Sequence, residues 1–400
     1  MSDNSANLSM GYLFKTFLKV GSFSFGGFMA LIAVLQKQMV EEDKTLDNQV
    51  LLDGVSLASI LPGPLAVNTV GFVGYRLKGF WGGLLSMFAV TLPCFLLVLL
   101  FSVFYFQYGE LQLFQTIISW VMPAIVVIIL MVVVNMSKKH LTGASHIVLS
   151  AVALVAGQWL NGIFATLVVM LVGAVFGFFF LRKKEENALT TNITASTNHL
   201  IRHFAVLLAV IVVIVLGLYF FQNESLWLTN LKVLFTFSSM SLTLFGGGYV
   251  IIPIIQETIV ESMQWLSLSE FNTALAISQI TPGPILISAT FIGYKVAGFT
   301  GACLATLGIF LPSGLLMIVC SHWLIRYKDN KNIKGIFEGL RPVVLGLILS
   351  AAITIARGTL TDEQALISFG LLLIAGLWFK LSTPMLMLSA MVIGLIGFLL

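Results

Sequence analysis

Charged side chains are scarce in this chain. Asp, Glu, Lys and Arg make up 10% of its 400 residues, against about 25% in a typical soluble domain. Hydrophobic residues make up 58%, and the mean hydropathy is +1.02. A soluble fold of this size cannot bury so much apolar surface. The composition therefore indicates a polytopic membrane protein, and it excludes a soluble enzyme, a nucleic-acid binder and a secreted disulfide-bonded domain.

Cysteine is equally rare, and the motifs of several enzyme classes are absent. Cys94, Cys303 and Cys320 all lie in apolar stretches, where an odd number indicates packing rather than a disulfide or metal site. The sequence has no G-x-x-x-x-G-K-S/T loop, which excludes a P-loop ATPase. His199 and His203 lie four residues apart but have no third ligand nearby. We therefore expect no enzyme activity, no metal and no cofactor.

Long apolar runs dominate what is present. Crossing a bilayer takes about 20 apolar residues as a helix, and only helices or closed barrels satisfy the backbone there. The polar first ten residues, followed by Lys15 and Lys19 inside the first apolar run, indicate no cleavable signal peptide. The runs predict an all-α protein with thirteen spans, at 12–35, 50–75, 79–106, 113–136, 143–160, 163–181, 203–222, 232–255, 270–294, 298–324, 335–357, 362–379 and 383–400.

The longest polar stretch divides the chain into two halves. It covers residues 182–202 and begins Arg-Lys-Lys-Glu-Glu. The predicted organisation is a polar N-terminus (1–11), a first repeat (12–181), a charged linker (182–202), a linking transmembrane helix (203–222) and a second repeat (232–400).

The distribution of Lys and Arg predicts the orientation in the membrane. With thirteen spans, the loops on one side carry thirteen of these residues and those on the other side carry five. Because cytoplasmic loops are enriched in Lys and Arg, we expect a cytoplasmic N-terminus and an external C-terminus. The predicted location is the cell (inner) membrane.

The two halves repeat one another. Phe25-Gly26-Gly27 corresponds to Phe245-Gly246-Gly247, and Pro62-Gly63-Pro64 corresponds to Pro282-Gly283-Pro284, both at an offset of 220 residues. From Gly74-Tyr75-Arg76 and Gly293-Tyr294-Lys295 onward the offset is 219. Most matched residues are Gly and Pro, which fix backbone shape. The sequence therefore repeats a backbone path.

The number of predicted spans gives the relative orientation of the repeats. Each repeat holds six spans. With the extra span at 203–222, the number of spans from a position in the first repeat to its equivalent in the second is seven, which is odd. The second repeat is then inserted upside down relative to the first. Inverted-topology repeats are typical of secondary transporters, in which a substrate site near the membrane midplane alternates between two related gates.

The Pro-Gly-Pro motifs predict the substrate site. Two prolines remove two backbone donors and interrupt the helix, and irregular backbone at membrane depth survives only inside protein or beside a wet cavity. The half-helix that follows each motif starts with unpaired N–H groups and a positive dipole end, which suits an anion. The predicted binding residues are Pro62, Gly63, Pro64, Asn68, Thr69, Pro282, Gly283, Pro284, Ser288, Gly26, Gly27, Gly246 and Gly247.

Ionisable or polar residues inside spans are candidates for charge compensation or proton coupling. Lys19 precedes the glycine break of the first span, and Arg341 directly precedes Pro342. Snorkelling to the membrane surface is an alternative role for such long cationic side chains. Asp53 lies nine residues before Pro62 and is the carboxylate that we expect to couple to protons. Gln279, three residues before Pro282, is a further pocket candidate.

These motifs together resemble the chromate transporter (CHR) family. The resemblance rests on Phe23–Phe28, Leu61–Asn68 and Gly74–Gly79 in the first half, and on Phe245–Tyr249, Thr281–Pro284 and Gly293–Lys295 in the second. It covers both halves and indicates a long-chain member with two fused domains. The family also has half-length members that work as pairs.

The resemblance implies a secondary active exporter of chromate, driven by the proton gradient and conferring chromate resistance. Its expected partners are a small inorganic oxyanion, protons and the lipid bilayer; a homodimer is compatible with this interpretation, and no nucleic acid is expected. Transport of a different anion, such as sulfate or an organic acid, is an alternative. A further alternative is an uncoupled channel or membrane scaffold.

Overall fold

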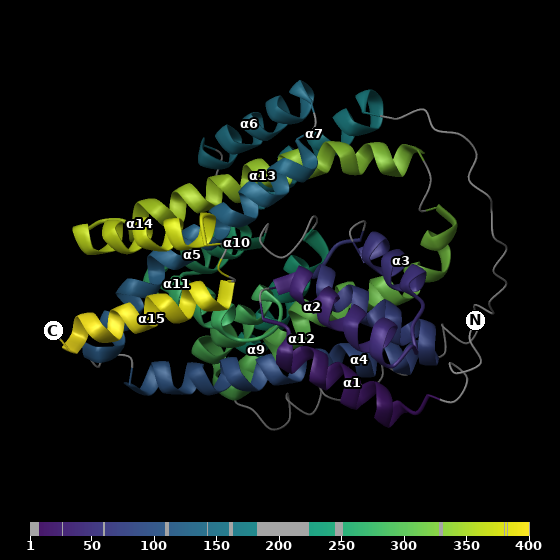
Figure 1. Cartoon of the computed structure of the whole chain (residues 1–400), viewed down its shortest axis with the longest axis horizontal. Coiled ribbons are helices and arrows are strands. Elements are labelled where there is room, and N and C mark those ends of the chain that lie inside the picture. Colours follow the sequence, from purple (N-terminus) through teal and green to yellow (C-terminus); the bar gives the residue numbers. More distant parts are fainter. Residues whose placement is uncertain are drawn as a thin grey trace.

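The described residues form helices joined by turns, with no strand among them (Figure 1). The computed structural model describes residues 8–181 except 26, 59–60, 109–111, 142 and 160–162, and residues 224–399 except 245–250, 328–330, 380 and 382. Many of these helices are apolar and expose large hydrophobic side chains. The expectation of an all-α polytopic membrane protein is confirmed. The predicted linker 182–202 and linking helix 203–222 lie outside the described residues.

Both halves present the same succession of elements, apart from one additional 3₁₀ turn in the second. The first half contains α1 (Met10–Phe23), α2 (Gly27–Leu35), the π-helix η2 (Gln36–Glu42), α3 (Asn48–Ala58), α4 (Leu65–Tyr108), α5 (Gln112–His140), α6 (Ala144–Trp159) and α7 (Ile163–Phe180). The second contains α9 (Glu224–Thr243), α10 (Ile251–Ile255), the π-helix η4 (Gln256–Ser262), α11 (Leu268–Ile280), the 3₁₀ turn η5 (Ile285–Ile287), α12 (Ser288–Tyr327), α13 (Lys331–Thr359), α14 (Glu363–Leu377) and α15 (Thr383–Leu399).

Positive φ angles recur at the same offsets as the sequence motifs. They occur in pairs at Lys44 (51°) and Gln264 (53°), at Gly63 (111°) and Gly283 (119°), and at Gly79 (68°) and Gly298 (63°). The first two pairs are 220 residues apart and the third 219. Since such angles are uncommon outside glycine, their pairing indicates that the two halves follow the same local backbone path.

The longest helices, α4 and α12, are each a pair of legs that fold back on one another. Their helical angles are interrupted at Lys78–Gly79 and at Ala297–Gly298. A Cβ placed on Gly74 would lie 2.5 Å from the carbonyl oxygen of Gly82, so the two legs of α4 pack backbone to backbone. We call residues 65–77 and 80–108 the first and second legs of α4, and residues 288–296 and 299–327 those of α12.

The segment 12–35, predicted as one crossing with a break, instead reverses direction. α1 ends at Phe23 and α2 begins at Gly27. Tyr12, near the start of α1, donates its hydroxyl to Asp43 Oδ2 (2.5 Å), which follows η2. In the second half, Thr236 Oγ1 of α9 lies 3.8 Å from Met263 Sδ, which follows η4. The prediction of a single crossing at 12–35 is wrong, because the chain reverses between the end of α1 at Phe23 and the start of α2 at Gly27.

The segment 50–75 also forms a hairpin rather than one crossing. α3 ends at Ala58 and α4 begins at Leu65. A Cβ on Gly54 would lie 2.6 Å from Phe72 Cδ1, so α3 packs along the first leg of α4. The break lies where the sequence predicts it, but the positive φ of Gly63 between two prolines turns the chain back. We call residues 61–64 and 281–284 the two Pro-Gly-Pro turns.

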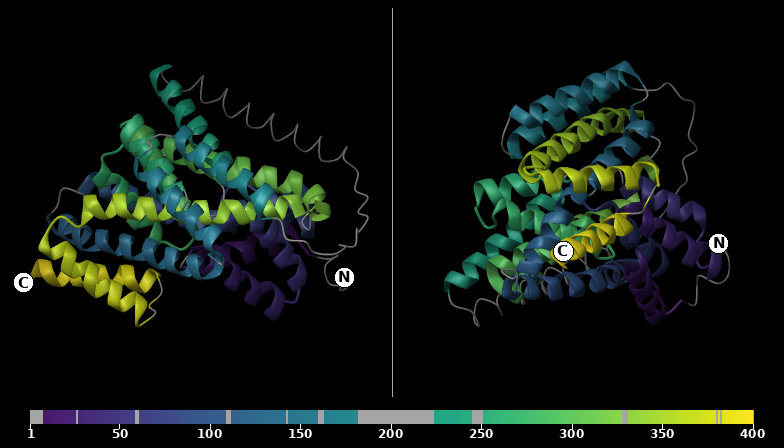
Figure 2. Two further views of the ribbon diagram at one scale, coloured as in Figure 1. Left: turned by 90° about the horizontal axis from the view of Figure 1, so that it is seen from above. Right: turned by 60° about the vertical axis from the view of Figure 1, so that its left-hand side comes forward.

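The two halves of the chain are interleaved. α5 of the first half packs against α14 and α15, while α13 of the second half packs against α6 and α7 (Figures 1 and 2). The second leg of α4 likewise lies against α12, as Gly83 beside Ile318 shows. Each half therefore completes its packing on the other, and the core runs between them.

Four helical stretches in the described part are long and apolar enough to cross a membrane. They are Leu65–Tyr108, Ser119–Lys138, Ile285–Ser321 and Glu338–Thr359. The first and third each include both legs of a folded-back helix. The pairs α6–α7 and α14–α15 consist of shorter apolar helices.

Candidate functional site

Each Pro-Gly-Pro turn is hydrogen-bonded to the opposite half of the chain. The backbone N–H of Gly63 donates to the carbonyl oxygen of Leu244 (2.6 Å), and that of Gly283 donates to the carbonyl oxygen of Ser24 (2.9 Å). Leu244 and Ser24 follow α9 and α1 and directly precede the Phe-Gly-Gly motifs. All four residues are buried. The breaks of the two halves therefore lie against one another.

The central glycine of each turn also packs against a helix of the other half. A Cβ on Gly63 would lie 2.1 Å from Ser313 Cβ, in the second leg of α12. A Cβ on Gly283 would lie 2.9 Å from Cys94 Sγ, in the second leg of α4. Ser313 and Cys94 correspond across the repeat at the offset of 219. Only glycine combines the positive φ with this close approach.

After each Pro-Gly-Pro turn, a buried polar side chain lies about four residues into the helix that follows. Asn68 is 0% exposed, and its Nδ2 donates to the carbonyl oxygen of Pro62 (3.0 Å). Its equivalent across the repeat, Ser288, is 1% exposed. Asn68 Oδ1 and Ser288 Oγ have no hydrogen-bond partner among the described residues. Two corresponding positions thus present unpaired polar atoms beside the turns.

The groups around the turns are neutral hydrogen-bonding groups. Among the described side chains, those of Asp, Glu, Lys and Arg are all at least partly exposed. The first N–H groups of a helix lack intrahelical acceptors, and α4 starts directly at its turn. The chemistry of such an arrangement suits a small polar solute, which it can contact through dipoles and hydrogen bonds. Among the residues that the structure describes there, no nucleophile and base are brought together.

Comparison with known proteins identifies the family. The chromate transporter family profile matches residues 11–178 and 231–395, which covers both halves.

The chain belongs to the chromate transporter family.

Relatives of this transporter match it over nearly their whole length. A probable chromate transport protein of Synechococcus elongatus is 29% identical over 398 residues, covering 97% of this chain and 95% of the relative. A chromate transport protein of Cupriavidus metallidurans is 28% identical over 396 residues, covering 96% and 92%. An uncharacterized transporter of Methanocaldococcus jannaschii is 28% identical, covering 89% and 87%. No solved structure matches the chain. The family is one of transporters and not of enzymes.

Most of the predicted binding residues that the structure describes are buried at the turns of this transporter. The residues of both Pro-Gly-Pro motifs, Thr69 and Gln279 are buried. The Thr69 hydroxyl donates to the carbonyl oxygen of Leu65 (2.8 Å), so its own helix already satisfies it. Gly26, Gly246 and Gly247 lie outside the described residues, and Gly27 is the first residue of α2.

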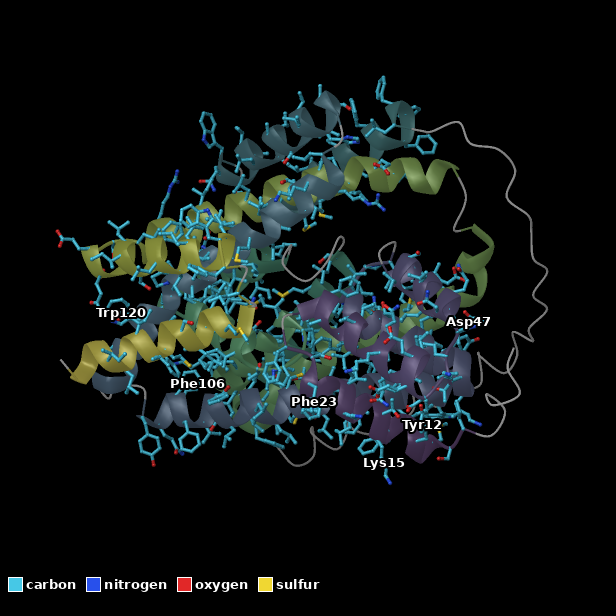
Figure 3. The ribbon with its side chains drawn as sticks, in the orientation of Figure 1. Tyr12, Lys15, Phe23, Asp47, Phe106 and Trp120 are labelled. Atoms are coloured by element: carbon cyan, nitrogen blue, oxygen red, sulfur yellow. The ribbon has the colours of Figure 1, made fainter. Side chains whose placement is uncertain are left out.

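Apart from Gln279, the predicted charge and coupling residues are at least partly exposed, and each has a hydrogen-bond or ion-pair partner outside the turns. Lys19 is exposed on α1 and donates to Gln38 Oε1 (2.6 Å). Asp53 is partly exposed on α3 and accepts from Gln49 Nε2 (3.2 Å). Arg341 on α13 pairs with Glu338 (3.2 Å). Figure 3 shows the start of α1, at Tyr12 and Lys15, farther from the middle of the molecule than Phe23 at its end.

A polar network in the first half escaped the sequence analysis. Asp43 accepts from Tyr12 and from Gln38 Nε2 (3.0 Å), and Tyr12 also contacts Thr45 Oγ1 (3.0 Å). The carbonyl groups of Ser24 and Leu244 were missed as well, because backbone acceptors leave no side-chain signal. Their place directly before the repeated Phe-Gly-Gly motifs was the available clue.

Proposed function

We propose that this protein exports chromate from the cytoplasm by secondary active transport coupled to the proton gradient, and so confers chromate resistance. The observation that supports this most strongly is the reciprocal pair of hydrogen bonds that join each Pro-Gly-Pro turn to the other half of the chain. The full-length similarity to proteins named as chromate transport proteins supports the choice of substrate.

The geometry of the turns suits alternation between two gates. Each turn is held partly by its own half and partly by the end of α1 or α9 in the other half. A relative movement of the halves would therefore change both turns together. In transporters with paired repeats, discontinuous helices of this kind hold the substrate near the midplane. We propose that the two turns, with Asn68 and Ser288, form the substrate site.

We propose that the repeats have inverted topology, with a cytoplasmic N-terminus and an external C-terminus in the inner membrane. If the hairpins at 12–42 and 50–75 each enter and leave on one side, each repeat loses two crossings. The number of membrane crossings between equivalent positions of the two repeats then stays odd, so the second repeat is still inverted relative to the first. Lys37 and Lys44 move to the side that is already rich in Lys and Arg, which agrees better with the positive-inside rule.

The coupling step requires a group that exchanges protons. Asp53 is the only acidic residue on α3 and remains our candidate. α3 packs along the first leg of α4, so movement of the Pro-Gly-Pro turn would move Asp53 as well. A homodimer remains compatible with this proposal.

Everted membrane vesicles test the proposal, because export appears in them as uptake. We expect energised vesicles carrying this chain to accumulate chromate, and an uncoupler to abolish the accumulation. A Pro62→Ala/Pro282→Ala double variant should lose at least about nine-tenths of the rate, because continuous helices would replace the turns. A Pro123→Ala/Pro342→Ala variant is the matched control, since these repeat-related prolines lie inside α5 and α13; it should keep most of the rate.

Three other results would change the conclusion. Uptake of sulfate or an organic acid instead of chromate would assign a different anion to the same architecture. Chromate flux that survives the uncoupler without accumulation would indicate a channel. Equal rates in both double variants would remove the turns from the site.

A further inference from the structure

Two equivalent positions hold buried polar atoms without partners. Asn68 Oδ1 and Ser288 Oγ are unpaired within the described residues, and the two residues are 0% and 1% exposed. Unpaired buried polar atoms are rare and costly. Three other described side chains also have a buried polar atom without a described partner: Trp120, Asn272 and Thr359. None of these three corresponds to another across the repeat. Recurrence at one place in both halves points to a ligand.

The free atom of Asn68 is an acceptor. Its Nδ2 is engaged by the carbonyl oxygen of Pro62, so the atom left free is the carbonyl oxygen Oδ1. This oxygen faces α12, lying 4.0 Å from where a Cβ on Gly314 would be. A carbonyl oxygen cannot donate. It therefore needs a donor from the ligand, and a fully deprotonated oxyanion offers none. The Ser288 hydroxyl can donate or accept.

The positive potential of the site is also limited. A helix N-terminus is equivalent to about half a positive charge, so the starts of α4 and of the η5–α12 helix supply about one together. The C-terminal ends of α1 and α9 meet the same turns and oppose them. No Lys or Arg among the described side chains is buried. This suffices for a monoanion at most, and a buried dianion would remain undercompensated.

We propose that the site binds a tetrahedral oxyanion in its monoprotonated form. The proposal rests on the proposed function and specifies its substrate. The O–H of the anion donates to Asn68 Oδ1, while its unprotonated oxygens accept from the first backbone N–H groups of α4, which lack intrahelical acceptors, and from the Ser288 hydroxyl. Chromate takes up its first proton near neutral pH, so the hydrogen chromate monoanion is available in a cell. The dihydrogen arsenate and dihydrogen phosphate monoanions offer the same combination of an O–H donor and unprotonated oxygens.

The substrate's own proton, rather than a titrating side chain, sets this pH dependence. Ionisable groups on the elements packed against Asn68 are at least partly exposed, apart from the buried thiol of Cys94, which packs on Gly283. The described ones on α1, α3, α4, α9, α11 and α12 are Tyr12, Lys15, Lys19, Asp53, Tyr75, Arg76, Lys78, Cys94, Tyr105, Tyr108, Lys232, Glu270, Tyr294, Lys295, Cys303 and Cys320.

Chromate counterflow in proteoliposomes tests the proposal without involving the driving force. The purified full-length protein is reconstituted with equal pH and no potential across the membrane, and exchange of labelled chromate is measured from mildly acidic to mildly alkaline pH. We expect the half-saturating total chromate concentration to rise by about tenfold per pH unit on the alkaline side. When the half-saturating concentration is recalculated for the hydrogen chromate monoanion alone, it should stay constant with pH. A half-saturation that is flat, or that falls as pH rises, would overturn the proposal while leaving chromate transport intact.

Substitutions separate substrate recognition from a structural role. Asn68→Leu should raise the half-saturating concentration at least about tenfold at acidic pH and flatten the pH dependence, because the variant no longer distinguishes the two forms. Ser288→Ala, which changes one atom, should raise it severalfold while keeping the pH dependence. Ser102→Ala is the matched control, since this buried hydroxyl is satisfied by the carbonyl oxygen of Val98 (2.7 Å); it should match the wild type.

The remaining outcomes are also decisive. If Asn68→Leu does not fold, the wild-type pH series and Ser288→Ala still decide the question. If Asn68→Leu transports and the pH dependence of its half-saturating concentration is unchanged, Asn68 only binds a water molecule or has a structural role, and the proposal fails. If exchange requires Na⁺ and the requirement disappears in Asn68→Leu, the free oxygen holds a cation, and the proposal also fails. No exchange at any pH by folded protein would refute the proposed function itself.

Discussion

The four glycines with positive φ in the described part of the chain fall into two classes that differ in their surroundings. Gly63 and Gly283 are buried in the turns and closely approached by the other half of the chain. Gly79 and Gly298 join the legs of α4 and α12, and a Cβ on either would meet nothing within 4 Å. The first class needs glycine for conformation and for space, and the second class needs it for conformation alone.

This difference predicts unequal effects of the same substitution. Gly79→Ala should cost about 1–2 kcal/mol, the penalty of left-handed backbone for a residue with a Cβ. Gly63→Ala should add an overpacking cost of about 1–3 kcal/mol, because its methyl group would overlap Ser313. Thermal unfolding in detergent and chromate counterflow measure both variants. Gly79→Ala should retain transport and Gly63→Ala should lose it; equal behaviour would contradict the close contact.

Among the elements, α7 and α13 make the closest helix contact through paired glycines. A Cβ on Gly339 would lie 2.0 Å from the carbonyl oxygen of Gly173, and a Cβ on Gly177 would lie 2.2 Å from that of Gly335. Both helices therefore carry a G-x-x-x-G pattern on the contact face. In a membrane, where apolar surface alone does not drive association, such close backbone packing holds helices together.

Substitution at this contact should separate the two helices. We expect Gly339→Leu to lower the unfolding temperature of the detergent-solubilised protein by several degrees, because its side chain cannot fit against α7. Gly370→Leu in α14 is the control, since nothing lies within 4 Å of a Cβ there. Cysteines introduced on α7 and α13 should cross-link in the control and fail to do so in Gly339→Leu. Cross-linking in both variants would show that the helices tolerate the larger residue.

At the scale of the whole molecule, the halves interlock and cannot be independent domains. α5 packs on the last two helices of the second half, and α13 packs on α6 and α7 of the first. The turns add reciprocal hydrogen bonds at the centre. A single half of this chain would leave these contact faces uncovered.

The proposed inverted topology predicts the sidedness of two equivalent positions. Gly79 and Gly298 correspond across the repeat, and both have room for a side chain. With a membrane-impermeant maleimide, Gly79→Cys should be labelled from the cytoplasmic side and Gly298→Cys from the outside. The wild type, whose Cys94, Cys303 and Cys320 are buried or partly buried, provides the background. Labelling of both variants from the same side would show that the repeats are parallel.

The sequence by itself determined the class of protein, the repeat and the positions of the breaks. Composition alone requires a membrane protein, because so much apolar surface cannot be hidden in a soluble fold. Gly and Pro mark the breaks because they act on their own residue's dihedral angles, which depend little on the rest of the chain. Asn68 and Ser288 could be predicted from the sequence for the same reason, because each follows its motif at a fixed distance.

Only the tertiary structure decided what happens at those breaks. Hydropathy is the same for an apolar stretch that continues across the membrane and for one that turns back, so the hairpins at 12–42 and 50–75 left no trace in composition. The partners of Gly63 and Gly283 are carbonyl groups of Leu244 and Ser24, distant in sequence and without side-chain identity. Asp53 likewise looked central by its distance from Pro62 along the chain. The reversal at the turn places it on a separate, partly exposed helix.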